Sequence, residues 1–148
     1  MVIETRFGVV EYSEADRILF PNGIPGFESL RYFLLIPGPD HSPILLLQSL
    51  DESSICFFTL PVDEAVSDYR LAISREDRDA LAPEHIIDPG RLLSLSILSI
   101  HENGEITANL LGPVVIYEPE RRGVQAIRHD TLYSAFQTVM PRGEGVQC

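Results

Sequence analysis

Short apolar runs closed by prolines dominate the first half of the chain. Six of the eleven prolines lie between these runs or at their ends, namely Pro21, Pro25, Pro37, Pro39, Pro43 and Pro61. Proline cannot donate to the hydrogen-bond ladder of a sheet, so it is confined to strand ends and edges. The pattern predicts a meander of short antiparallel strands over residues 2–12, 17–20, 32–36, 44–50 and 55–60.

Two of these runs are apolar at consecutive positions, in Leu45–Leu47 and at Phe57 and Phe58. A strand with one solvated face alternates apolar and polar side chains, because successive side chains point to opposite faces. We therefore expect both faces of these two strands to be covered.

The second half combines one helix with further strands. Ser74 followed by Asp77 resembles a capping box and starts a helix that ends before Pro83. Residues 69–73 are predicted to form a strand, and 92–100 returns over 106–110 across a two-residue turn at Asn103 and Gly104. Residues 114–117 and 124–127 form a second hairpin.

About nine short strands and one main short helix predict a mainly β protein. We expect a single domain over residues 1–148, built as an antiparallel β-barrel or a strongly curved sandwich. Closure of the sheet would remove its exposed edges.

Residues 22–28, Asn-Gly-Ile-Pro-Gly-Phe-Glu, form a corner between two β-rich runs. Gly23 and Gly26 are free to adopt positive φ, and Pro25 fixes its own φ. The pattern predicts a rigid turn, with Phe27 as the apolar anchor that holds it against the core.

Charge limits the classes of partner. The chain has 22 acidic and 11 basic residues, a formal net charge of −11, which excludes direct nucleic-acid binding. Either the acidity favours a basic protein partner or it only keeps the protein soluble. No apolar run has the length of a bilayer span and the first residues do not resemble a leader, so we expect a cytoplasmic protein without membrane contact.

The sequence contains no catalytic motif that would make the protein an enzyme. It has no phosphate-binding loop, no nucleophile elbow and no His-Glu-x-x-His, and the four histidines lack metal-ligand spacing. Cys56 lies in an apolar run, where a buried thiol is favoured over a catalytic nucleophile. We expect no cofactor and no metal site.

Acidic side chains are the candidates for partner binding. They are Asp51, Glu52, Asp63, Glu64, Asp68, Glu102 and Glu105. In a two-residue hairpin Glu102 and Glu105 would face each other, and such a like-charge pair attracts a cationic partner. The alternative is an ordinary charged hairpin end.

Gln48 and Asn109 are polar residues inside apolar strands. A buried amide must find hydrogen-bond partners. We favour internal polar clasps, and the alternative is an exposed edge that binds the backbone of a partner.

The corner belongs to an ordered series of blocks, with 18–20 before it and 46–49, 57–61 and 107–116 after it. Gln125 and Tyr133 follow. The series resembles the FliW family of flagellar assembly factors over nearly the whole chain. Gly112 stands where the family more often has alanine, and residues 141–148 match nothing and are candidates for a disordered tail. The motif residues, interpreted as structural, are Gly23, Ile24, Pro25, Gly26, Phe27, Glu28, Gln48, Asn109 and Pro113.

The resemblance implies a non-enzymatic protein with two alternative partners, flagellin and the basic RNA-binding regulator CsrA. Export of flagellin would free the protein to bind CsrA, antagonise its RNA binding and relieve repression of flagellin translation. Either the acidic protein covers the RNA site or it binds beside that site, and the family implies the second route.

The terminal segments of flagellin are amphipathic helices, so an apolar groove is expected. Phe27, Leu46 and Phe58 are candidate lining residues, with a core position as the favoured alternative. The rival hypothesis is a small-ligand-binding β-barrel carrier.

Overall fold

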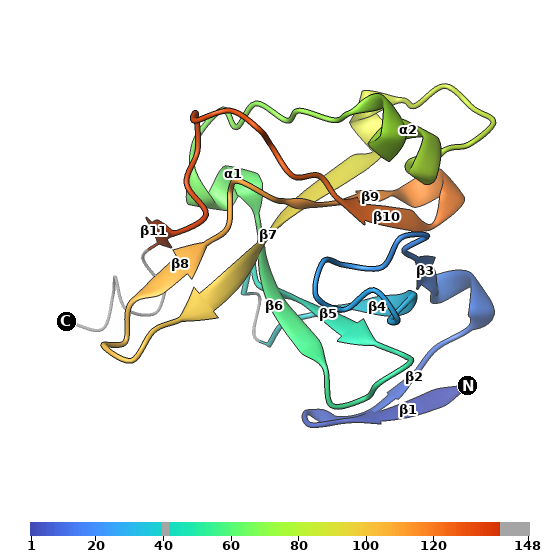
Figure 1. Ribbon diagram of the computed structural model, residues 1–148. Coiled ribbons are helices and arrows are strands. Elements are labelled where there is room, and N and C mark those ends of the chain that lie inside the picture. The colour runs from blue at the N-terminus through green and yellow to red at the C-terminus, as the bar shows by residue number, and fades with distance from the viewer. Residues whose placement is uncertain (40–41, 140–148) are drawn as a thin grey trace.

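The computed structural model describes residues 1–39 and 42–139 (Figure 1). His41, the expected tail over 141–148 and Cys148 lie outside the described residues.

Seven strands form a closed barrel. They are β3 (Ile18–Leu19), β4 (Tyr32–Pro37), β5 (Leu45–Ser49), β6 (Cys56–Pro61), β7 (Leu92–Ile100), β9 (Val114–Tyr117) and β10 (Arg122–Gln125). They pair in the order β3-β4-β5-β6-β7-β9-β10, and β10 closes the ring by pairing in parallel with β3. The other pairs in the ring are antiparallel. The predicted mainly β fold is confirmed, in the barrel form.

The consecutive apolar positions lie on two faces, as predicted. Leu47 is fully buried in the barrel core together with Phe33, and Phe57 packs against that core with its ring centroid 6.3 Å from that of Phe33. Phe58 points the other way, and its ring centroid lies 5.9 Å from that of Phe7 in the N-terminal hairpin. Strands β5 and β6 are therefore covered inside by the core and outside by the hairpin.

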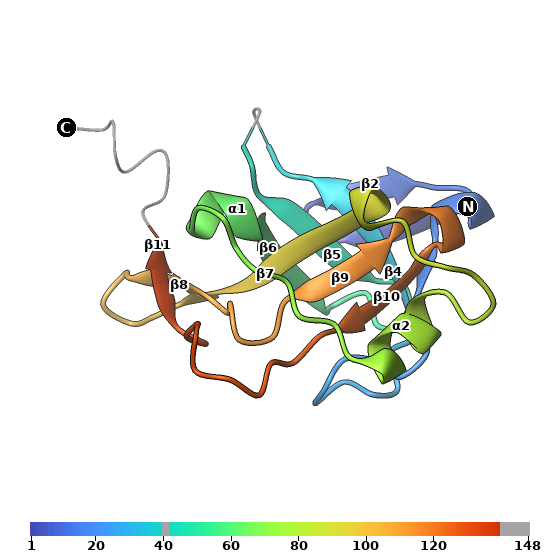
Figure 2. The same ribbon diagram turned by 90° about the horizontal axis from the view of Figure 1, so that it is seen from above.

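Two elements cover the outer faces of the barrel (Figures 1 and 2). The hairpin of β1 (Val2–Thr5) and β2 (Gly8–Glu11) lies beside β5 and β6. Helix α2 (Arg75–Leu81) packs Leu81 onto Val115 and Val124 of β9 and β10. Its N-cap is as predicted, because Ser74 Oγ accepts a hydrogen bond from the Asp77 backbone N–H at 3.0 Å.

Strand β7 is long enough to leave the barrel and build a second sheet. Its last residues pair with β8 (Ile106–Ala108), which pairs with β11 (Gln137–Val139). The remaining elements are the short helix α1 (Val62–Ala65) and 3-10 turns at Glu14–Asp16, Pro89–Arg91 and Glu118–Glu120.

Strands β8 and β9 follow one another along the same edge of β7, and residues 109–113 bulge out between them. Asn109 Oδ1 accepts hydrogen bonds from the backbone N–H groups of Leu111 and Gly112 at 3.1 and 3.0 Å. Gln125 Nε2 donates to the Gly112 carbonyl at 2.8 Å. Two family-motif side chains thus close the bulge from within the chain.

One strand prediction was wrong, and one strand was missed. Residues 69–73 pair with no strand in the described part of the chain, because side chains satisfy the backbone instead: the Arg70 N–H donates to the Tyr133 hydroxyl at 2.9 Å and its carbonyl accepts from Arg128. Strand β11 was not predicted. Its partner β8 is about thirty residues away in the chain, so local sequence patterns do not predict the pairing.

The turn between β7 and β8 also differs from the prediction. His101 N–H donates to the Glu105 carbonyl at 2.8 Å, so the loop has three residues, 102–104, and ends in Gly104 with φ +87°. A three-residue hairpin loop places its glycine in this left-handed position. The expected facing pair of Glu102 and Glu105 is therefore not formed, and His101 lies opposite Glu105.

The corner at 22–28 has the predicted positive φ values, +65° at Gly23 and +89° at Gly26. Its buried anchor is Ile24, which is 2% exposed. Phe27, the predicted anchor, is 36% exposed. Its ring and that of Phe57 lie edge to face, with 5.3 Å between the ring centroids.

Substitution of the two corner glycines should separate backbone strain from steric clash. A Cβ at Gly26 would meet nothing within 4 Å, so Gly26→Ala should lower the free energy of unfolding by about 1–2 kcal/mol through its φ alone. A Cβ at Gly23 would lie 2.6 Å from the Glu28 backbone, so Gly23→Ala should cost about 1–3 kcal/mol more. Urea unfolding measures both, with Gly90→Ala as the control. Equal losses for the two variants would exclude the clash.

A buried arginine joins the segments outside the barrel. Arg128 is 6% exposed and forms a bidentate pair with Asp130, with Nη2 to Oδ2 at 2.8 Å and Nε to Oδ1 at 3.0 Å. Its guanidinium lies 5.0 Å from the ring centroid of Tyr133 and also donates to the Arg70 carbonyl. Tyr69 donates to the Leu110 carbonyl at 2.6 Å. The cluster fixes residues 69–70 and 128–133 against the bulge.

Neutralising Asp130 should change how stability depends on pH. The hydrogen bonds from Arg128 hold the pKa of Asp130 below its ordinary value of 3.8, so the pair contributes stability above that pH. This contribution is lost as the pH falls through the lowered pKa of the folded state. Asp130→Asn should therefore lower the Tm at neutral pH, and its difference from the parent chain should shrink below pH 3.8. Thermal unfolding across this range measures it. Asp79→Asn is the control, and a pH-independent difference at Asp130 would contradict the assignment.

Candidate partner-binding site

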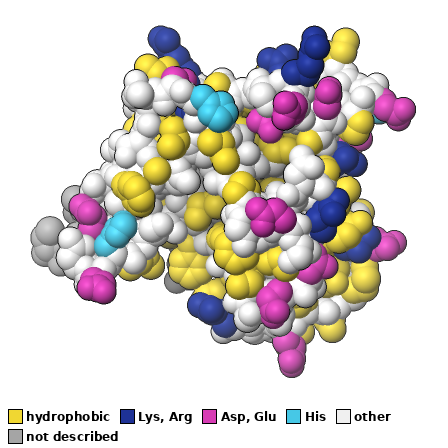
Figure 3. All heavy atoms as spheres, viewed as in Figure 1, with side chains coloured by type: hydrophobic (Ala, Val, Ile, Leu, Met, Phe, Trp, Pro, Cys, Tyr) yellow, Lys and Arg dark blue, Asp and Glu magenta, His cyan; other side chains and the backbone are white. Residues whose placement is uncertain are grey.

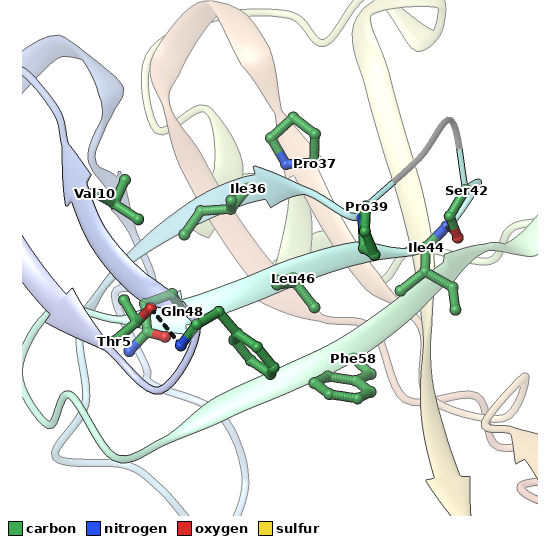
Figure 4. A pocket seen from close by; sticks show the side chains of 11 residues that line it. Thr5, Val10, Ile36, Pro37, Pro39, Ser42, Ile44, Leu46, Gln48 and Phe58 are labelled. Carbon is green, nitrogen blue, oxygen red and sulfur yellow. Dashed lines mark hydrogen bonds between the residues drawn. The ribbon is translucent and has the colours of Figure 1, made fainter.

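An apolar groove of about 460 Å³ opens between the N-terminal hairpin and the outer face of β4–β6 (Figure 4). It is lined by Thr5, Phe7, Val10, Ile36, Pro37, Pro39, Ser42, Ile44, Leu46, Gln48 and Phe58. The volume lies in the range of about 300–1,000 Å³ that is typical of binding pockets.

The hairpin forms one wall of the groove without joining the barrel sheet. Strands β1 and β2 form a two-stranded sheet of their own, closed by a two-residue loop at Arg6 and Phe7. Thr5 Oγ1 accepts from the Phe7 N–H at 3.0 Å and donates to the Gly8 carbonyl at 2.8 Å. The hairpin tip rests on the barrel through Phe7 and Phe58.

Apolar side chains form the floor. Leu46 and Phe58 are direct neighbours across β5 and β6, and Ile36 follows on β4. At the hairpin tip, Phe7 is 56% exposed, so the apolar surface continues out of the groove. The groove is suited to apolar side chains of a partner.

Gln48 lines the groove, but its amide is committed to its own chain. Its Nε2 donates to the carbonyls of Ser49, Ser53 and Ile55 at 2.9, 3.0 and 3.2 Å. The side chain is 1% exposed and holds the turn between β5 and β6. Its contacts are those of an internal clasp.

The structure brings together two of the three residues named for the groove. Leu46 and Phe58 line it, whereas Phe27 lies against Phe57 on the opposite face of β6. Sequence reasoning did not identify Phe7 and Val10. The alternation along the two strands places Ile3 and Val10 on one face of the hairpin, but Phe7 lies in the loop and the sequence carried no signal for where the hairpin docks.

The acidic candidates occupy three separate places (Figure 1). Asp51 and Glu52 are in the β5–β6 turn, Asp63, Glu64 and Asp68 are on α1 and just after it, and Glu102 and Glu105 are at the β7–β8 end. On the face shown in Figure 3, acidic side chains are scattered among hydrophobic ones.

Three of the acidic candidates accept hydrogen bonds from other residues of the chain. Asp51 Oδ2 accepts from the backbone N–H groups of Arg31 and Tyr32 at 2.7 and 3.0 Å, and Glu52 accepts from Ser54 at 3.1 Å. Glu105 accepts from Thr138 at 3.3 Å. Asp63, Glu64 and Asp68 are all exposed.

The remaining motif residues hold the corner and the bulge. Glu28 accepts from the Gly26 N–H at 3.0 Å, and this hydrogen bond lowers the pKa of the Glu28 carboxyl. Pro113 is fully buried, and its carbonyl accepts from the Ala126 N–H at 2.8 Å.

Among residues 1–39 and 42–139, no three or more His, Cys, Asp and Glu side chains come together as metal ligands would. Partial burial raises the pKa of the Cys56 thiol, which disfavours the reactive thiolate. No helix in this part of the chain is long and apolar enough to cross a membrane.

Comparison with known proteins relates this barrel to one family. The model of the FliW protein family matches residues 1–139. The flagellar assembly factor FliW of Caldanaerobacter subterraneus is 39% identical over 86% of this chain and 84% of its own length. Flagellar assembly factor FliW 2 of Desulfotalea psychrophila is 30% identical over 94% and 89%. A crystal structure of the flagellar assembly factor FliW superposes with a TM-score of 0.85 at 26% identity, covering 96% of this chain and 99% of the other. The overall fold is thus that of a known architecture, and this chain belongs to the FliW family.

Proposed function

We propose that this protein is a non-enzymatic flagellar assembly factor that binds flagellin and, when free, binds CsrA and antagonises its RNA binding. The observation that carries the proposal is an apolar groove, open to a partner, on the outside of a FliW-family barrel. Relatives of this chain are named as flagellar assembly factors, which supports the same role. The proposal assigns the protein to the cytoplasm, where both partners are made.

Flagellin is proposed to bind through an amphipathic helix laid in the groove. Recognition of this kind places apolar anchors of the helix, spaced three to four residues apart, into a hydrophobic surface. Leu46 and Phe58 would receive such anchors, and Phe7 would form the wall beside them. The exposed Phe7 would become buried on binding, which adds to affinity.

CsrA is proposed to bind the acidic surface at α1. The net charge of −11 favours encounter with a basic protein, and Asp63, Glu64 and Asp68 are exposed there. Bound beside the RNA site, the acidic protein would repel the phosphate backbone without occupying that site, which is the non-competitive route.

The two partners would form a switch by mass action. Flagellin in the cytoplasm lowers the concentration of free protein, so CsrA remains available to repress flagellin translation. Export of flagellin frees the protein to bind CsrA, and repression is relieved. Because each ligand lowers the free pool, this scheme needs no catalytic step.

The groove assignment can be tested with two matched phenylalanines. Phe7→Asp should weaken flagellin binding at least about tenfold, since it places a charge beside the apolar floor. Phe136→Asp is the control, because Phe136 is 66% exposed, makes one aromatic contact and lies on the segment leading to β11, far from the groove. Titration calorimetry with flagellin measures both variants. Equal affinities of the two variants for flagellin would contradict the assignment of the groove as the flagellin site.

The same groove has a volume that a small molecule could fill, which keeps the carrier hypothesis as the second candidate. Native mass spectrometry of the purified protein distinguishes the two. A stoichiometric bound molecule that flagellin does not displace would favour the carrier.

The acidic surface at α1 can be tested by charge reversal. Asp63→Lys with Asp68→Asn should weaken CsrA binding several-fold at low salt, and the difference should shrink as salt screens the charges. Asparagine is chosen at position 68 because Asp68 has φ +56°, a conformation that asparagine tolerates. Glu4→Lys with Glu84→Gln makes the same change in net charge elsewhere. Affinity for CsrA is measured by calorimetry. Equal affinities of the two double variants would mean that only the net charge matters and would contradict a specific site at α1.

A further inference from the structure

A second cavity, of about 490 Å³, lies between helix α2 and the chain that follows it. Arg75, Arg78 and Asp79 line it from the helix, and Ile73, Ile86 and Ile87 line it from the flanking segments. It is distinct from the apolar groove, because α2 and the N-terminal hairpin lie on opposite sides of the barrel in Figures 1 and 2.

Ile86 is the most exposed large hydrophobic side chain of the described residues, at 95%. A single exposed isoleucine on a surface is ordinary. This one borders a cavity to which Ile73 and Ile87 also contribute. Ile73 and Ile87 are partly buried against the core beneath α2, and Ile86 is the one of the three that the fold leaves uncovered.

The two arginines of this cavity are uncommitted, in contrast to most others. Within residues 1–39 and 42–139, the guanidinium groups of Arg75 and Arg78 make no hydrogen bond, ion pair or ring contact, and both residues are exposed. The guanidinium groups that do bind carboxylates, carbonyls or rings of the fold are those of Arg6, Arg17, Arg31, Arg91, Arg121, Arg122 and Arg128.

The acidic side chains of α2 do not neutralise this pair. Arg75 and Arg78 are three residues apart, which places them on one face of the helix. Asp77 lines a different pocket beside Gly23 and Glu28. Asp79 shares the cavity, but no ion pair joins it to either arginine among the described residues.

We infer that this cavity docks an acidic segment of a protein partner, with an aliphatic side chain against the isoleucines and carboxylates on Arg75 and Arg78. Arginine binds carboxylates in a bidentate geometry and is the preferred cation for such contacts at interfaces. Figure 3 shows basic side chains together with hydrophobic and acidic ones over the α2 end of the molecule. This surface is therefore complementary to an acidic partner, whereas the acidic surface at α1 is proposed to bind the basic protein CsrA.

The experiment uses the full chain and two fluorescent amphipathic peptides. One peptide has glutamates on both borders of an isoleucine and leucine face, and the other has lysine at every glutamate position. Fluorescence anisotropy should show saturable binding of the glutamate peptide. Arg75→Glu with Arg78→Glu should weaken that binding at least tenfold, and Ile86→Asp should weaken it as well.

Arg70→Glu is the control, matched in net charge to Arg78→Glu alone, because its exposed guanidinium also has no partner among the described residues while its backbone is held elsewhere. It should change the affinity less than twofold. Glutamate is a good helix former, so the paired variant keeps α2, and circular dichroism checks this.

Three results would overturn the inference. The first is the absence of saturable binding of the glutamate peptide, and the second is an equal loss of affinity in the Arg70→Glu variant. The third comes from sedimentation velocity without peptide: a dimer that the paired variant abolishes would make the occupant a second copy of this chain.

Discussion

The parallel contact between β10 and β3 is the constraint on which the rest of the structure depends, because it turns a sheet into a barrel. The seam is short, with Arg122 opposite Leu19 and the Leu19 N–H donating to the Arg121 carbonyl at 2.9 Å. A Cβ on Gly123 would lie 2.5 Å from the ring of Phe20, which is fully buried. Because Gly123 has no side chain, the ring of Phe20 fits beneath the seam. Closure in turn fixes which side chains face inward and leaves the outer faces for the hairpin and α2.

Sequence reasoning recovered what local physics controls. Apolar residues at consecutive positions of β5 and β6 required two covered faces, and both are covered. The glycines of the corner required positive φ, and Ser74 required a helix start, as observed. The failures are of another kind. At residues 69–73 the competitor for the backbone is the side chain of Tyr133, and β11 pairs with a distant strand. In both cases the interacting residues lie far apart in the chain, so a local stretch of sequence does not contain both of them.

The candidate site was recoverable in part for the same reason. Leu46 and Phe58 are adjacent across two strands whose pairing the pattern gives, so both were named for one groove. Phe27 was misplaced because a one-residue difference along β6 decides the face, and it lies against Phe57 and not beside Phe58. The wall contributed by Phe7 depends on where an independent hairpin docks, which alternation cannot specify. The acidic residues were chosen by charge alone, and charge does not predict that Asp51 is occupied by two backbone N–H groups.

The way the groove is built bears on how one partner could exclude another. The proposed sites for flagellin and CsrA lie on different elements, so mutual exclusion requires either overlap of the bound partners or an element with two arrangements that both sites bias. The barrel strands are poor candidates for such an element, because moving one breaks sheet hydrogen bonds on both sides. The β1–β2 hairpin pairs with no barrel strand and rests on β6 through Phe7 and on the Ser54 carbonyl through Arg6. The hairpin can therefore shift with the loss of only a few contacts. If binding at one site changes the groove through the protein, this hairpin is the element whose movement costs the least free energy.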